Sequence, residues 1–158
     1  LDTANTDMCP ACEALLYAAA RAQHVSQVIR PAVERGMLVL CDRFVDSSVA
    51  YQGGGRGLGV ETVQQINDPA VDGMTPDATL YLAIDHREAL RRGLFLASGG
   101  RLELEAGEFH ERVQKAYERL VRDNRRRFVV VDAARGVDEV ARDALDAVLE
   151  RLLPDRRA

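Results

Sequence analysis

The stretch CDRFVDSSVAYQGGGRG, residues 41–57, decides how this chain folds and where its chemistry lies. An apolar run at 37–41 ends abruptly in Asp42 and Arg43, and hydroxylated residues, an aromatic, an amide and three glycines follow. Short continuous apolar runs are typical of strands buried in parallel sheets. Ligands of open α/β sheets bind beyond the carboxyl ends of such strands. The stretch therefore predicts a strand at 37–41 with a polar binding site at its exit.

Helices and strands alternate around this stretch. Apolar residues at three- and four-residue spacing, from Leu15 to Ile29, predict a helix over 12–35 that Gly36 ends. Further helices are predicted at 60–72, after Asp85, at 107–126 and at 137–153, and further strands at 79–84 and 128–131. Such alternation indicates βαβ crossovers, and therefore the α/β class with a mostly parallel sheet and helices on both faces.

Size, charge and hydropathy favour a one-domain protein and argue against a nucleic-acid-binding or membrane-spanning one. A chain of 158 residues predicts one domain with a real core. The net charge of −4 argues against a nucleic-acid-binding protein, which usually carries a basic balance. Arg125–Arg127 is therefore interpreted as a solvated helix end. No apolar run reaches the ~18 residues of a membrane span, and no signal peptide is visible.

Three predicted strands are each followed by an aspartate. Asp85, with Glu88 three residues later, fits a capping box, and Asp132 fits a turn. Asp42 is followed directly by Arg43 and a dense polar stretch. Among the three acids, Asp42 is therefore the candidate for function.

The glycine run does not match a known phosphate-binding loop. GGGRGLG fits the dinucleotide pattern GxGxxG in no register, and the Walker A pattern GxxxxGK[ST] is absent, since Lys115 is the only lysine. We interpret the glycines as permitting a tight backbone path after Gln52.

The cysteines indicate no function by themselves. Cys9 and Cys12 form a CxxC pair, but a zinc site needs four ligands and no second pair follows. A redox CxxC normally follows a strand, and none is predicted before Cys9. The pair is therefore interpreted as coincidental, and Cys41 as a small core residue.

Four stretches together resemble bacterial thymidylate kinases and, with their spacing, cover almost all of residues 10–150. They are EALLYAAARAQHV (13–25), residues 41–57, PDATLYLAIDHREALRR (76–92) and GRLELEAGEFHERVQKAY (100–117). The resemblance implies a three-layer α/β/α P-loop nucleoside monophosphate kinase fold, as one domain over 1–158 with a lid at about 93–106. The family's N-terminal strand and Walker A loop are absent from this chain by that comparison.

The resemblance also implies an activity. Family members transfer the γ-phosphoryl group of ATP to dTMP with Mg²⁺, giving dTDP for dTTP synthesis, and work as cytoplasmic homodimers. No nucleic-acid or membrane partner is expected. Without a Walker A segment, the chain as given is expected to be inactive.

Two residues on the first helix are candidates for binding the base. Tyr17 and Arg21 are four apart and so share a helix face. An aromatic ring beside a guanidinium suits a nucleobase, and the resemblance implies that role. The alternative is a core Tyr17, with Arg21 paired to Glu13 or Glu34.

The remaining site residues follow from the resemblance. Arg43 would bind the acceptor phosphate and Asp42 would hold Mg²⁺ through water, while Tyr51 would crowd the sugar 2′ position. The pocket would be completed by Ser47 and Gln52, with Arg56 as a less supported member, and Arg101 would act from the lid.

The chain departs from the family in its lid and near one strand end. Gly100 stands where the family usually has Asp, an apolar LFLA segment occupies 94–97, and Ala83 stands where an Asp is common. The alternative function is therefore a nucleotide-binding but catalytically inactive relative. A third possibility, an unrelated α/β nucleotide-binding domain, is disfavoured by the joint occurrence of the motifs of the first helix and of 41–57.

Overall fold

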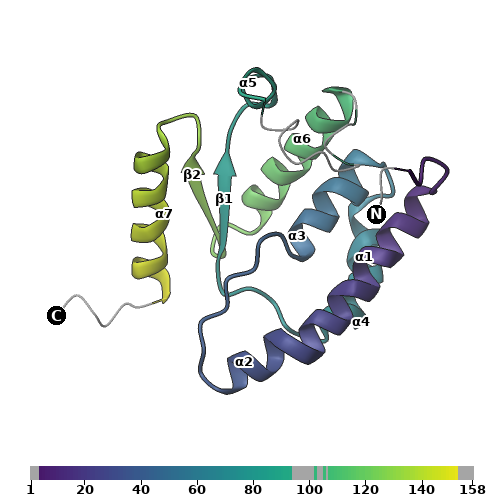
Figure 1. Ribbon diagram of the computed structural model, residues 1–158, viewed down its shortest axis with the longest axis horizontal. Helices are drawn as coiled ribbons and strands as arrows, with labels where there is room; N and C mark the ends of the chain where they lie inside the picture. Colours follow the sequence, from purple (N-terminus) through teal and green to yellow (C-terminus); the bar gives the residue numbers. More distant parts are fainter. Residues whose placement is uncertain (1–3, 94–101, 103–104, 106, 153–158) are drawn as a thin grey trace.

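A two-stranded parallel sheet with helices around it forms the frame of the molecule (Figure 1). The computed structural model describes residues 4–93, 102, 105 and 107–152. None of the helices in these ranges is long and apolar enough to cross a lipid bilayer.

The first long helix confirms the prediction for 12–35. It runs through α1 (Pro10–His24), a π-helical segment η1 (Val25–Ile29) and α2 (Arg30–Glu34). The buried face carries Ala14, Ala18, Val25 and Ile29, whereas Leu15, predicted on that face, is 56% exposed. Ala18, Val25 and Ile29 are thus buried as predicted, but Ala14 is buried in place of Leu15, which is left at the surface.

The stretch after Asp42 is helical, which the sequence did not predict. It comprises α3 (Val45–Ser48) and the π-helical segment η2 (Val49–Gly55). A Cβ at Gly54 would lie 2.6 Å from Ala116 Cβ, and one at Gly55 would lie 2.5 Å from Phe109 Cε2. The glycines, interpreted from the sequence as permitting a tight backbone path after Gln52, lie in a π-helical segment, where Gly54 and Gly55 allow η2 to pack closely against another helix.

The second half alternates as predicted. Its elements are α4 (Val60–Val71), β1 (Thr79–Ala83), α5 (His86–Arg91), α6 (Gly107–Asp123), β2 (Phe128–Asp132) and α7 (Val137–Leu152). The strands pair in parallel, with Thr79 opposite Phe128 and Ala83 opposite Asp132. Figure 1 shows α6 and α7 on opposite sides of the strands.

The predicted strand at 37–41 is wrong. This segment joins no ladder, and Leu38 and Leu40 are 59% and 80% exposed. A strand exists only beside a hydrogen-bonded neighbour, and within the described ranges only β1 and β2 pair. Cys41, interpreted as a core residue, is exposed for the same reason.

The hydrophobic core lies where α6 meets η2 and the sheet. Its buried members come from four elements and one residue outside them, namely Val49, Ala50, Val63, Leu102, Phe109, Val113, Leu120 and Phe128. Since α3 leads directly into η2, the two form one continuous helical segment. The core that holds η2 therefore also holds the position of α3, which follows Arg43.

Candidate functional site

A cavity of about 240 Å³ brings the predicted acceptor-site residues together. Its lining consists of Tyr17, Arg21, Asp42, Arg43, Phe44, Ser47, Ser48, Tyr51, Gln52 and Leu102. α1 supplies the first two residues, the segment before α3 supplies the next three, and α3 and η2 supply most of the rest. Seven of the eight candidates within the described ranges therefore line one cavity, and the exception is Arg56.

Arg43 has an unusual backbone at the mouth of this cavity. Its φ is +62°, a left-handed conformation that costs energy for a non-glycine residue. The guanidinium carbon lies 5.2 Å from the centre of the Tyr51 ring, a distance suited to a cation–π contact. The strained backbone and the ring together orient an exposed cation beside the cavity.

Arg21 is held by neighbours that the sequence did not identify. Its guanidinium donates to Asn67 Oδ1, to the carbonyl oxygen of Phe44 at 3.2 Å and to Ser48 Oγ at 2.9 Å. Asn67 is 1% exposed and donates in turn to Val63 O. Burial lowers the pKa of Arg21 from its ordinary value. The alternative of pairing with Glu13 or Glu34 is wrong.

An ion pair between a buried aspartate and a half-buried arginine ties the site helix α3 to the sheet. Arg127 donates to both carboxylate oxygens of Asp46, at 2.6 and 2.7 Å, and Thr79 Oγ1 of β1 donates to the same carboxylate at 3.0 Å. The interpretation of Arg125–Arg127 as wholly solvated is therefore wrong for Arg127. Sequence spacing carried no signal for this pair, since its members are 81 residues apart.

Ser47 is anchored to α6. Its hydroxyl lies 2.8 Å from Tyr117 Oη, and burial raises the pKa of Tyr117. The Tyr117 ring stacks on Tyr81 of β1, with centroids 5.0 Å apart. Ser47 therefore lines the cavity and is linked through Tyr117 to both α6 and β1.

Gln52 and Arg56 belong to a buried network beneath the cavity. Glu13 is 1% exposed and accepts from Gln52 Nε2 at 3.0 Å and from Arg56 Nε and Nη2, both at 3.1 Å. Arg56 also pairs with Glu105 at 2.6 Å. Burial opposes the charge of Arg56, but these two carboxylates raise its pKa above the usual value. Arg56 is thus occupied by protein carboxylates and does not line the cavity.

The donor set at Asp42 fits a hydrated magnesium ion. Within the described ranges, no group of three or more His, Cys, Asp or Glu side chains converges as a metal site. Mg²⁺ keeps several waters and takes only one or two protein carboxylates beside substrate phosphates. An exposed Asp42 carboxylate in the cavity lining meets that requirement.

The expected lid lies mostly outside the described residues, and so does Arg101. Leu102, which is described, is 5% exposed and lines the cavity. Its contact with the core was not predicted, because a single apolar residue in a polar segment does not indicate whether its side chain faces the core or the solvent.

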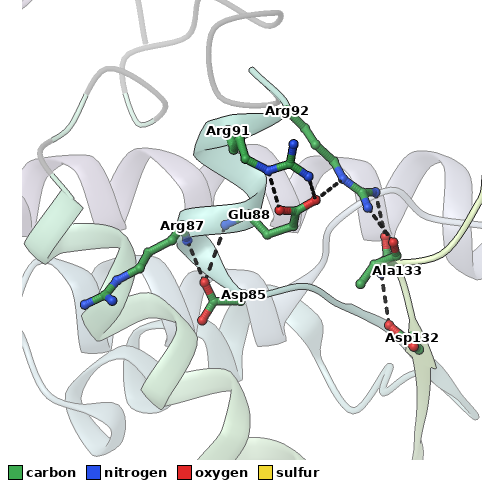
Figure 2. A network of polar contacts seen from close by, with 8 residues as sticks. Asp85, Arg87, Glu88, Arg91, Arg92, Asp132 and Ala133 are labelled. Carbon is green, nitrogen blue, oxygen red and sulfur yellow. Dashed lines mark hydrogen bonds and ion pairs between the residues drawn. The ribbon is translucent and has the colours of Figure 1, made fainter.

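The exits of β1 and β2 form a second polar cluster (Figure 2). Asp85 accepts from the backbone N–H groups of Arg87 and Glu88, which confirms it as a helix cap. Asp132 accepts from Ala134 N at 2.9 Å and closes a turn. Arg92 bridges the two exits through Ala133 O at 3.2 Å. Asp42 is the one acid of the three that lines the cavity.

Comparison with known proteins agrees with this arrangement. The family model described as "Thymidylate kinase" matches residues 1–144. The thymidylate kinase of Bacillus pumilus (strain SAFR-032) is 46% identical over 156 residues, which cover 96% of this chain and 73% of that protein. The thymidylate kinase of Lactiplantibacillus plantarum is 47% identical over 154 residues (96% and 70%), and that of Geobacillus thermodenitrificans is 46% identical over 159 residues (99% and 71%). The chain belongs to the thymidylate kinase family.

Proposed function

We propose that this protein is a dTMP kinase, which transfers the γ-phosphoryl group of ATP to dTMP and yields ADP and dTDP. The observation that carries the proposal is the single cavity into which Tyr17, Arg21, Arg43, Ser47 and Tyr51 converge. Phosphoryl transfer depends mainly on positioning and on stabilising charge, and a preorganised polar cavity supplies both.

The base of dTMP is assigned to the α1 side of the cavity. Tyr17 offers an aromatic face, and Arg21 offers N–H donors whose direction is fixed by Asn67, Ser48 and the Phe44 carbonyl. A donor held by three neighbours loses little entropy when it binds a carbonyl oxygen of the base. Because the Arg21 donors are held in one direction, we expect them to select a base whose carbonyl oxygen lies opposite them.

The acceptor phosphate is assigned to Arg43. Its planar fork can donate to two phosphate oxygens at once. The Tyr51 ring supports the guanidinium from one side and is the residue assigned to crowd the sugar 2′ position. Gln52, tied to Glu13, supports the floor of the cavity.

Magnesium is assigned to Asp42. When bound, the ion would neutralise charge on the transferring phosphates. Asp42 would contribute a carboxylate that holds the ion through water, and Arg43 beside it would keep the acceptor phosphate in position. Arg101 is assigned to act on the transferred group from the lid.

The ATP phosphates require a loop that these residues do not contain. The 158 residues hold no Walker A pattern, so they cannot by themselves surround the β- and γ-phosphates with loop N–H groups. A second hollow of about 240 Å³ lies between 38–41 and β1, lined by Leu38, Leu40 and Leu80 among others. An exposed apolar segment facing a strand edge suits a further parallel strand. We assign that place to the strand that carries the family's phosphate loop, within a three-layer α/β/α fold.

A homodimer is assigned to the exposed face of α1. Leu15 and Leu16 are 56% and 46% exposed, and the exposed Ala19 and Ala20 beside them permit close helix approach. Light scattering on the intact gene product at micromolar concentration should give the mass of a dimer. A clean monomer would contradict the assignment.

Two measurements test the proposed function. Calorimetric titration should detect dTMP binding to the 158-residue chain, with dUMP or a ribonucleotide bound more weakly. An assay of ADP release should show no dTMP-dependent turnover by this chain, but turnover by the intact gene product. If neither protein shows turnover although dTMP still binds, the second candidate would be favoured, an inactive nucleotide-binding relative, which Gly100 and the apolar segment at 94–97 support.

A further inference from the structure

Two thiols lie in the first turn of α1. Cys9 is the N-cap residue, with an extended backbone (φ −70°, ψ 153°), and Pro10 begins the helix. Cys12 follows three residues after Cys9, and both side chains are exposed and free. The helical turn thus places a dithiol at the surface, without the preceding strand that a redox CxxC normally has.

The spacing of this pair suits a disulfide. Side chains three apart on a helix have Cβ atoms roughly 5–6 Å apart, and a disulfide needs roughly 3.5–4.5 Å. The N-cap backbone can supply the difference, because Cys9 lies outside the helical ladder and only its carbonyl oxygen is engaged, accepting from Glu13 N at 3.1 Å. No residue of the helix interior has to move.

The turn that carries the thiols is firmly held. Glu13, next to Cys12, is 1% exposed and is bound by Gln52 and Arg56. Groups fixed on one rigid turn react with each other far more readily than with groups in solution. The second cysteine therefore has a large advantage over any external thiol.

We propose that Cys9 and Cys12 form a reversible redox site, which exchanges with low-molecular-weight disulfides. One cysteine thiolate attacks the external disulfide, forms a mixed disulfide and releases one external thiolate. The second cysteine thiolate then attacks the mixed disulfide, which forms the Cys9–Cys12 bond and releases the second external thiolate. The two protons lost by the protein thiols go to the two released thiolates, so two protein thiols are oxidised as one external disulfide is reduced. This site is independent of the proposed kinase activity.

Thiol trapping after redox equilibration tests the site. The 158-residue chain is equilibrated with mixtures of reduced and oxidised glutathione, alkylated and digested with trypsin. Both cysteines of the pair fall on the peptide that ends at Arg21, whereas Cys41 falls on the separate peptide that ends at Arg43. Mass spectrometry then distinguishes an internal disulfide, two hydrogen atoms lighter, from added glutathione.

The expected result is an internal disulfide in the first peptide, formed at an oxidised glutathione level at least about tenfold below that which modifies Cys41. Cys41→Ser should leave this unchanged. Cys9→Ser, which introduces a favoured N-cap residue, and Cys12→Ser should each replace the internal disulfide by glutathione on the remaining thiol. Separate glutathione adducts on Cys9 and Cys12 in the unmodified chain, or oxidation no easier than at Cys41, would overturn the proposal.

Discussion

Glu13 and Glu88 each receive several guanidinium hydrogen bonds, yet they lie in opposite environments. Glu13 is 1% exposed and binds Arg56 and Gln52 beneath the cavity. Glu88 lies on the surface turn of α5 and accepts from Arg91 and Arg92 at 2.7 Å (Figure 2). The bonds to Glu88 are shorter, so hydrogen-bond length alone would rank it first.

Burial reverses that ranking. A surface ion pair competes with water and salt, and it contributes little to folding. A buried carboxylate has lost its water, so the loss of its partner leaves a charge that nothing compensates. We therefore expect the site side of the molecule to tolerate substitution poorly and the exits of β1 and β2 to tolerate it well.

The largest expected effect comes from Arg56→Ala. It removes the cation that faces both Glu13 and Glu105. Loss of one partner of a buried pair costs about 3–5 kcal/mol in the free energy of unfolding, measured by urea denaturation. Glu13→Gln combined with Arg56→Ala should cost less than Arg56→Ala alone, because no buried charge remains. If Arg56→Ala alone were as stable as the unmodified chain, the claim that burial makes the ion pair of Glu13 more important than that of Glu88 would be contradicted.

The second-largest effect is expected for Arg43→Ala. This variant tests the site side of the molecule through dTMP affinity instead of the free energy of unfolding. A charge-assisted hydrogen bond contributes about 1.5–3 kcal/mol, so dTMP affinity should fall roughly ten- to a hundredfold in a calorimetric titration. Arg43→Lys should recover only part of this, because an ammonium group lacks the planar fork.

Asp42→Asn is the matched variant for Arg43. It should leave dTMP affinity nearly unchanged and lower turnover in the intact gene product, because its assigned partner is the metal. Unchanged affinity in Arg43→Ala would instead show that another arginine holds the phosphate.

Close packing behind the site should give an intermediate effect. Gly55→Ala would place a Cβ 2.5 Å from the Phe109 ring and 2.8 Å from Val113 Cγ2, in the buried core. Such overpacking typically costs about 1–3 kcal/mol in unfolding free energy. Gly107→Ala, at the start of α6 with no atom within 4 Å of the added Cβ, is the control and should be close to neutral in the same denaturation experiment.

The smallest expected effect is that of Glu88→Gln. Hydrogen bonds from Arg91 and Arg92 lower the pKa of Glu88 from 4.5 to about 2. Because the folded-state pKa lies below the unfolded one, the contribution of Glu88 is present above pH 4.5 and is lost as the pH falls toward 2. Thermal melts of both proteins should differ slightly at neutral pH and converge across that window. A difference as large as that of Arg56→Ala would contradict the ranking by burial.

Sequence patterns predicted those elements that depend on residues close together in the chain. The 3.6-residue periodicity predicted the long first helix, and helix–strand alternation predicted strands at 79–84 and 128–131 within a mostly parallel sheet, which agrees with the parallel β1 and β2. The cap at Asp85 follows from the chain immediately after it. The site candidates came from the spacing of Asp42, Arg43 and Tyr51 together with the family resemblance, and they line one cavity.

Tertiary structure decided what depends on distant partners. Asp46 with Arg127 and Arg21 with Asn67 lie 81 and 46 residues apart, and no local pattern marks such pairs. The apolar segment at 37–41 has the composition of a strand but joins no sheet, because hydrogen bonding requires a neighbour.

The glycines show the same division between sequence and structure. Their number signalled a special backbone, but whether they form a turn or allow close packing depends on what lies opposite them. Ala116 and Phe109 of α6 lie there, more than fifty residues along the chain. Sequence by itself determined the family, the order of elements and the residue types of the site. Only the three-dimensional packing decided which charges are buried and which glycines leave no room for a Cβ, because burial is a property of neighbours that the chain brings together by folding.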